Sequence, residues 1–114
     1  MRKGGMVGAL AALSGAVAVA AGAFGAHGAS GKAAEWLATG AHYQLIHAVA
    51  ALVAISLPRG RGAALLLLLG AALFAGTLYA MALGAPRWLG AVTPLGGAAM
   101  IGGWVVLAMA TLRK

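Results

Sequence analysis

Apolar residues run along the chain in four long blocks, separated by three short segments. The blocks cover residues 6–29, 33–57, 62–83 and 94–112. Each is near the roughly 20 residues that an α-helix needs to cross the hydrocarbon core of a bilayer. Because the connecting segments are short, consecutive helices must run antiparallel. The pattern therefore predicts an all-α fold, an integral membrane antiparallel four-helix bundle that forms a single domain over residues 1–114.

The composition excludes a water-soluble domain. Hydrophobic residues make up 63% of the chain, and charged residues only 8%, whereas a soluble domain has roughly a quarter of its residues charged. In lipid the backbone must satisfy its own hydrogen bonds, so the four blocks are helices rather than open strands. The chain has no cysteine, which excludes disulfides, thiolate metal sites and cysteine nucleophiles.

The positive charge is placed at the ends of the blocks, and this placement predicts orientation. The formal net charge is +7, but its positions are those of membrane anchors, so we expect no nucleic-acid partner. With four crossings, six of the eight basic residues share one side of the membrane: Arg2, Lys3, Arg59, Arg61, Arg113 and Lys114. That side is expected to be cytoplasmic and to hold both termini.

Residues 1–29 have a second interpretation. A basic start, an apolar stretch and small residues at its end are also features of a secretory signal peptide. The apolar run is longer than the usual signal core, however, and three further spanning blocks follow it. We therefore expect this segment to be retained as the first helix.

Small residues recur at four-residue spacing on three of the blocks, as in Ala18–Gly22–Ala26 and Ala72–Gly76–Ala80. Lipid tails are as apolar as leucine, so helices associate in membranes through small faces that let their backbones approach. Such faces fit either a mobile interface, as in a transporter, or plain tight packing, which the alanine-rich composition favours. The glycines expected at helix contacts are Gly22, Gly25, Gly76, Gly96, Gly97 and Gly103.

The second block carries an unusual set of polar residues in "TGAHYQLIHA". On a helical wheel Glu35, Thr39 and His42 fall within about 60° of one another, Tyr43 and His47 extend this stripe, and Gln44 points elsewhere. The stripe is expected to face a protein neighbour or a cavity. Folding the chain about its short gaps further predicts contacts of His27 with Glu35, and of His47 with the first-helix face around Ser14.

Three interpretations of these histidines remain open. Neutral imidazoles can join helices as structural hydrogen-bond donors, bind a proton or small ligand in a cavity, or ligate a metal or haem. Metal is disfavoured because His42 and His47 are five residues apart, about 140° around a helix, whereas paired ligands usually sit three or four apart. Glu35 is the one acidic residue, which excludes a carboxylate dyad. We expect no metal, no cofactor and no enzymatic activity.

Five motifs in one order then carry a resemblance: "GAFGAHG" at 22–28, "TGAHYQLIHA" at 39–48, "LFAGTLY" at 73–79, "LGAVTPLGG" at 89–97 and "GW" at 103–104. The chain resembles the YgdD family of small bacterial inner-membrane proteins, whose function is unknown and which has a eukaryotic transmembrane relative. The resemblance implies a four-helix protein of the bacterial inner membrane. It also implies that His42 departs from the family's recurring polar positions, which shifts weight to His27 and His47.

The leading hypothesis is a non-enzymatic accessory or interaction protein. Its expected partners are the lipid bilayer and either further copies of itself, in a homo-oligomer, or the subunits of a larger membrane complex. The alternative is a transporter or channel-like protein that binds a proton or small ligand at His27, Tyr43, Gln44 and His47. Metal or haem binding is the third hypothesis. The candidate polar positions are His27, Glu35, Thr39, His42, Tyr43, Gln44, His47, Thr77, Tyr79 and Thr93.

Overall fold

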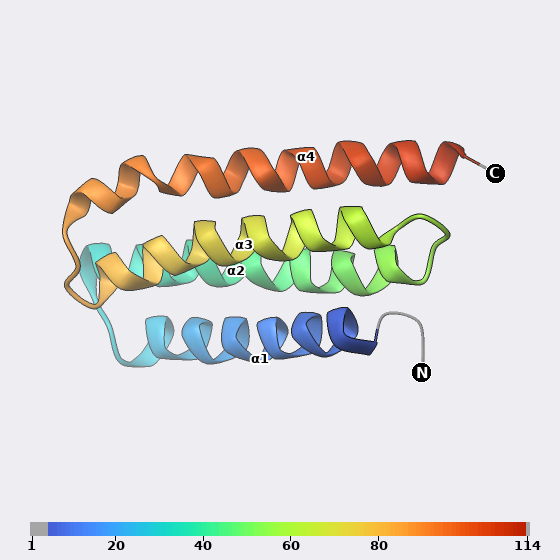
Figure 1. Cartoon of the computed structure of the whole chain (residues 1–114). Coiled ribbons are helices and arrows are strands. Elements are labelled where there is room, and N and C mark those ends of the chain that lie inside the picture. Colours follow the sequence, from blue (N-terminus) through green and yellow to red (C-terminus); the bar gives the residue numbers. More distant parts are fainter. Residues whose placement is uncertain (1–4, 114) are drawn as a thin grey trace.

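The observed helices follow the four apolar blocks. The structure is a computed structural model that describes residues 5–113, with α1 (Gly5–His27), α2 (Gly31–Ile55), α3 (Arg61–Ala82), the short 3-10 helix η1 (Arg87–Ala91) and α4 (Thr93–Leu112) (Figure 1). The four α-helices are long and apolar enough to cross a membrane. Their 20 to 25 residues correspond to about 30–38 Å at 1.5 Å per residue. The predicted all-α four-helix membrane fold is confirmed.

The helices form a flattened arrangement. Figure 1 shows α2 and α3 in the middle, with α1 on one side of this pair and α4 on the other. The chain measures 48 × 26 × 18 Å along its principal axes, so it is about two helices thick in its shortest direction. Because α1 and α4 each cover one side only, both leave wide apolar faces exposed, as Leu13 and Ile101 show.

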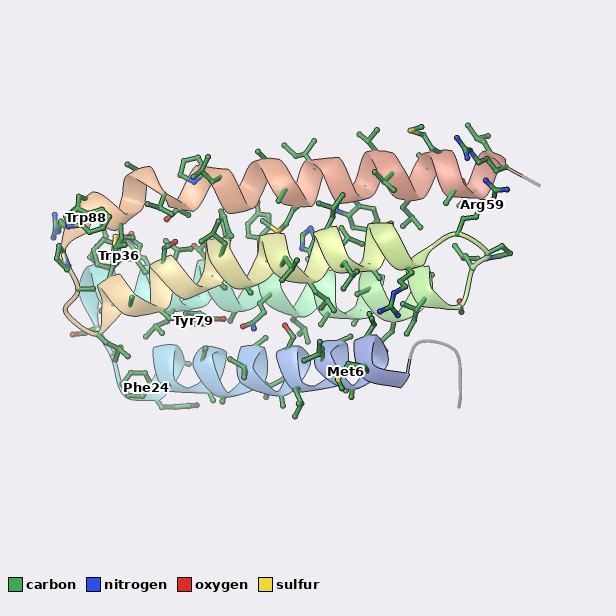
Figure 2. All side chains as sticks on the ribbon, viewed as in Figure 1. Met6, Phe24, Trp36, Arg59, Tyr79 and Trp88 are labelled. Atoms are coloured by element: carbon green, nitrogen blue, oxygen red, sulfur yellow. The ribbon has the colours of Figure 1, made fainter. Side chains whose placement is uncertain are left out.

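Aromatic and basic side chains mark the two ends of this arrangement. Figure 2 shows Trp36 and Trp88 near one end and Arg59 at the other. The guanidinium carbon of Arg87 lies 5.5 Å from the ring centroid of Trp36, a cation–π contact. Tryptophan is enriched where a bilayer meets water, so this end fits the interface opposite the Arg59 end.

The closest helix approach is between α3 and α4. A Cβ atom on Gly96 would lie 2.6 Å from the carbonyl oxygen of Gly70, and one on Gly70 would lie 2.7 Å from the backbone nitrogen of Met100. Further along, a Cβ atom on Gly103 would lie 2.8 Å from Leu67 Cδ2. The glycines therefore let two backbones meet where no side chain fits. The predictions for Gly96 and Gly103 are confirmed, and Gly70 is an additional contact.

The α1–α2 contact is built in the same way but is less tight. A Cβ atom on Gly25 would lie 3.0 Å from Leu37 Cβ, and one on Gly22 would lie 3.5 Å from Ala41 Cβ. Both glycines thus lie at a helix contact, as predicted, and the helix that they face is α2. Ordinary van der Waals distances at Gly22 leave room for a methyl group, whereas Gly25 leaves almost none.

The predicted packing face of α3 is wrong by one residue. Gly76 is exposed, and a Cβ atom there would meet nothing within 4 Å. The buried small residues next to it in sequence order are Ala71 and Ala75, and Ala63, Ala64 and Gly70 are buried as well. A one-residue step turns a helix by 100°, so the row through Gly76 faces away from them. Gly97 also contributes little to close approach, since its Cβ atom would meet only Phe74 Cδ1, at 3.9 Å.

Candidate functional site: a polar network and an aromatic groove

Gln44 lies at the centre of the polar network. Its Nε2 donates to Ser14 Oγ at 3.1 Å, and its Oε1 accepts from the Tyr79 hydroxyl at 2.6 Å. Gln44 is 6% exposed, and the Tyr79 ring packs against Gly40, where a Cβ atom would lie 2.6 Å from Cε1. One amide therefore joins α1, α2 and α3 in the apolar interior, where neither water nor lipid could satisfy it.

His47 connects α2 to α4. Trp104 Nε1 donates to His47 Nε2 at 3.0 Å, and His47 Nδ1 lies 2.6 Å from the carbonyl oxygen of Tyr43. Since indole is only a donor and a carbonyl is only an acceptor, the imidazole carries its proton on Nδ1 and accepts on Nε2. Both ring nitrogens thus have partners, which fits a structural role for this histidine. The bond to another helix is accepted by His47 rather than donated by it, unlike the predicted arrangement.

A third polar contact lies at the end of the molecule where α4 begins. The hydroxyls of Thr77 and Thr93 are 2.6 Å apart, so one donates to the other. Both side chains are buried. Thr93 Oγ1 also donates to the Leu89 carbonyl at 3.2 Å, and the residue before the helix, Val92, has no side-chain capping bond. Thr93 therefore ties η1 and α3 to α4 rather than capping the helix.

Beside this network, α2, α3 and α4 enclose a groove of about 390 Å³. Its wall is largely aromatic: the centroids of Tyr43 and Phe74 are 4.9 Å apart, and those of His47 and Trp104 are 5.7 Å apart. Tyr43 and Trp104 are 42% and 43% exposed, so the groove is open to the surroundings of the helices. The groove is lined by Tyr43, His47, Phe74, Gly97, Met100, Ile101 and Trp104.

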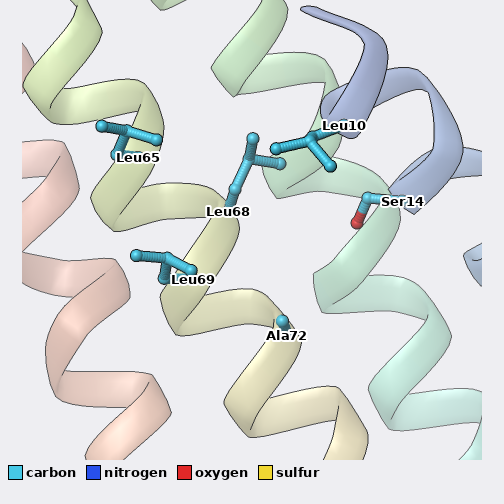
Figure 3. A pocket seen from close by; sticks show the side chains of 6 residues that line it. All are labelled: Leu10, Ser14, Leu65, Leu68, Leu69 and Ala72. Atoms are coloured by element: carbon cyan, nitrogen blue, oxygen red, sulfur yellow. The ribbon is translucent and has the colours of Figure 1, made fainter. Parts of the chain in front are cut away.

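A second hollow, of about 180 Å³, lies between α1 and α3 (Figure 3). Its one polar side chain is Ser14, whose oxygen already accepts from Gln44. The hollow therefore offers a polar ligand little to bind. Its lining residues are Leu10, Ser14, Leu65, Leu68, Leu69 and Ala72.

The structure places the predicted stripe of α2 differently from the helical-wheel interpretation. Glu35, Thr39 and His42 are exposed, whereas Gln44, which was expected to point elsewhere, is buried together with His47. The reason is that the packed face of α2 is set by its small residues, and Gln44 lies on that face. Within residues 5–113, Glu35, Thr39 and His42 thus face away from the neighbouring helices, and only His47 of the predicted stripe bonds to another helix.

Two predicted contacts are wrong. Glu35 Oε1 lies 3.5 Å from Lys32 Nζ, and within the described part of the chain His27 has no hydrogen bond to it; both side chains are exposed. His47 turns to Trp104 of α4, while the partner of Ser14 is Gln44, about one turn away. The predicted contact with the face around Ser14 was thus correct in its level along α2 to within about one turn, but wrong in its direction around the helix. Trp104 was the partner that sequence reasoning missed.

The remaining candidates divide between the network and the surface. Tyr79, Thr77 and Thr93 belong to hydrogen-bonded pairs in the interior, and His27 is exposed at the end of α1. Among residues 5–113, no three His, Asp, Glu or Cys side chains are grouped so that they could hold a metal ion.

Comparison with known proteins identifies the family. A family model described as "Protein of unknown function (DUF423)" matches residues 21–97. The chain is 42% identical to a UPF0382 membrane protein of Haemophilus influenzae over 73% of this chain and 71% of that protein. It is 39% identical to the UPF0382 inner membrane protein YgdD of Escherichia coli K12 over 68% of this chain and 64% of that protein.

Similarity extends to a UPF0382 membrane protein of Staphylococcus epidermidis, at 44% identity over 62% of each chain. The alignments thus span less than two thirds of the E. coli and S. epidermidis relatives. No solved structure matches the chain. The matched family segment holds Gln44, His47 and Tyr79, but ends before Trp104 and begins after Ser14. With its four membrane-length helices, this chain belongs to the UPF0382 (DUF423) family of membrane proteins of unknown function that includes the inner membrane protein YgdD.

Proposed function

We propose that this chain is a non-enzymatic inner-membrane protein that works by lateral association in the bilayer, as a homo-oligomer. The buried side-chain nitrogen and oxygen atoms of residues 5–113 all have hydrogen-bond partners. Several of these bonds join different helices, which supports a structural role for the polar network.

The observation that carries the association is the outward face of α2. Exposed residues occur along it at alternating steps of four and three, the 3.5-residue spacing of helices that pack on a partner helix. His42, near the middle of this 25-residue helix, is exposed within it. Ionisable side chains at this depth almost always face protein rather than lipid. The outer stripe consists of Glu35, Thr39, His42, Ile46, Val49 and Val53.

A second copy of the chain fits this stripe. If two α2 helices pack parallel about a twofold axis, each residue of the outer stripe meets its own counterpart. A neutral imidazole has one donor and one acceptor, so two His42 side chains can satisfy each other. The exposed Lys32 and Glu35, at the same end of both helices, are likewise complementary in charge.

The transporter alternative has less support. Gln44 and His47 already bond to Ser14, Tyr79 and Trp104. His27 lies at the far end of α1 and is exposed. The four residues named for that function therefore do not line one path.

Disulfide cross-linking in native membranes tests the proposed association. The chain has no cysteine, so a single introduced cysteine reports on one position. We expect His42→Cys and Val49→Cys to form disulfide-linked dimers under mild oxidation, because the two α2 helices meet there. The matched control is Leu69→Cys on α3, which is exposed near the middle of its helix but lies off the stripe.

Equal cross-linking at all three positions would indicate random collision and would contradict the proposal, as would no cross-linking at any. A photo-cross-linker at position 42 identifies the partner directly. If its adduct is heavier than two copies of the chain, α2 contacts a different protein in a larger complex rather than a second copy.

We also infer that both termini face the cytoplasm. Arg59 in the α2–α3 connection and Arg113 after α4 line one hollow of about 190 Å³, so positive charge gathers at one end of the bundle. The positive-inside rule favours that end as cytoplasmic.

Two exposed serines provide a matched test of this orientation: Ser30 before α2 and Ser56 after it. In spheroplasts, a membrane-impermeant maleimide is expected to label Ser30→Cys directly and Ser56→Cys only after lysis. The reverse pattern would show the opposite orientation.

A further inference from the structure

Tyr43, which lines the groove between α2, α3 and α4, carries a hydroxyl without a hydrogen-bond partner in the described part of the chain. Within residues 5–113, the Tyr43 phenol makes no hydrogen bond, although the neighbouring His47, Gln44 and Trp104 do. Tyr43 is the thirteenth of 25 residues in α2, so it lies near the bilayer centre, where lipid tails offer no hydrogen-bonding groups. A phenol left without a partner there costs free energy, so an occupant that supplies an acceptor is favoured.

The rest of the groove wall selects the shape of that occupant. Tyr43 and His47 are stacked with centroids 6.2 Å apart and an interplanar angle of 23°, and Phe74 lies 4.9 Å from Tyr43. Aromatic faces favour flat partners through offset stacking and edge-to-face contact. A volume of about 390 Å³ is within the roughly 300–1,000 Å³ of small-molecule sites.

Among its described lining residues, the groove has no charged side chain that would bind an ionic ligand. None of the seven lining side chains is an acid, a lysine or an arginine. His47 is held as a neutral imidazole, because Trp104 donates to Nε2 and the proton on Nδ1 is directed at a carbonyl. The groove therefore suits a neutral molecule that dissolves in the membrane.

We propose that this groove binds a flat, membrane-soluble ring that carries a carbonyl oxygen, which is the chemistry of a quinone headgroup. The carbonyl accepts the Tyr43 hydroxyl, and the ring stacks among Tyr43, Phe74 and Trp104. A lipid acyl chain could fill the same volume, but it would leave the phenol without a partner. This inference is independent of the proposed association, since it concerns the α4 side of α2 rather than the outer stripe.

Trp104 fluorescence provides the test. In a Trp36→Phe/Trp88→Phe background Trp104 is the sole tryptophan, and decylubiquinone is added to the protein in mild detergent micelles. We expect saturable quenching whose apparent affinity falls about five- to tenfold in Tyr43→Phe, the loss of one hydrogen bond. Gly97→Leu should abolish it by filling the groove, and position 97 accommodates a Cβ atom at 3.9 Å from Phe74.

Decylbenzene, which has the same ten-carbon chain and a ring but no carbonyl, is the matched ligand control. It should compete only weakly with decylubiquinone, and the concentration needed for competition should be the same for the original chain and for Tyr43→Phe. If decylbenzene competes as well as the quinone binds, the groove holds apolar chains only and the proposal is overturned. Quenching that survives Gly97→Leu also overturns it. Leu13→Ala, on the exposed face of α1 and away from the groove, should leave binding unchanged, and circular dichroism verifies that each variant is folded.

Discussion

Gly96→Ala is expected to destabilise the fold by about 3 kcal/mol, near the upper end of the usual cost of overpacking a tight contact. The added Cβ atom would lie 2.6 Å from the Gly70 carbonyl oxygen and 2.8 Å from Phe74 Cα. Both are backbone atoms, so no side-chain rotation relieves the clash and α4 must move away from α3. Unfolding by added SDS in mixed micelles, followed by tryptophan fluorescence, measures the loss.

Gly102→Ala is the matched control, because it makes the same change on the same helix. A Cβ atom at Gly102 meets nothing within 4 Å, so its stability should equal that of the original chain or rise slightly with the higher helix propensity of alanine. If Gly96→Ala and Gly102→Ala unfold at the same SDS fraction, the close α3–α4 approach does not stabilise the protein.

The helices could be predicted from the sequence because the solvent dictates them. A run of about 20 apolar residues has one low-energy conformation in lipid, an α-helix that spans it. The bounds in the structure accordingly differ from the predicted ones by at most two residues. The face of each helix that packs against a neighbour was less predictable. In an alanine-rich helix, several rows of residues at four-residue spacing consist of equally small side chains. On α3 the row through Gly76 and the row through Ala75 differ by one residue, and nothing in the local sequence distinguishes them.

The sequence predicts at which level along the helices the polar contacts lie, but not towards which neighbouring helix each side chain points. Folding consecutive helices about a short gap fixes which residues are level, and it placed Ser14 within about a turn of its partner. It gives no relation between α2 and α4, which are not consecutive, so the bond between Trp104 and His47 was not foreseen. The wheel also grouped polar residues together, whereas the fold buries Gln44 and exposes His42.

These contacts have a shared structural role. The flattened arrangement leaves α1 and α4 on opposite sides of the α2–α3 pair, and hydrophobic burial does not hold helices together in lipid. Gln44 attaches α1 and α3 to α2, and His47 attaches α4 to α2. A few directional bonds on α2 thus supplement the small-residue contacts in fixing the positions of the outer helices.

Gln44→Leu is accordingly expected to cost about 1–3 kcal/mol, since it removes two interhelical hydrogen bonds that are worth about 0.6 kcal/mol on average and up to about 1.7 kcal/mol each in membrane proteins. The change keeps a similar volume but leaves the Tyr79 and Ser14 hydroxyls without their partner. The same SDS titration measures it. Thr39→Val is the control, because Thr39 is an exposed polar residue of the same helix, and it should change stability little.

A double-mutant cycle distinguishes the two bonds. Ser14 only accepts from Gln44, so its proton is free to bond a carbonyl of the preceding turn of α1 with or without Gln44. The Tyr79 hydroxyl donates to Gln44 and is too far from its own backbone to find another acceptor there. The coupling of Gln44→Leu with Tyr79→Phe is therefore expected to be about 1 kcal/mol, and larger than its coupling with Ser14→Ala. Equal couplings, or none with Tyr79, would show that the 2.6 Å phenol–amide bond is not what holds α3 to α2, and that the small-residue contacts alone determine how these helices pack.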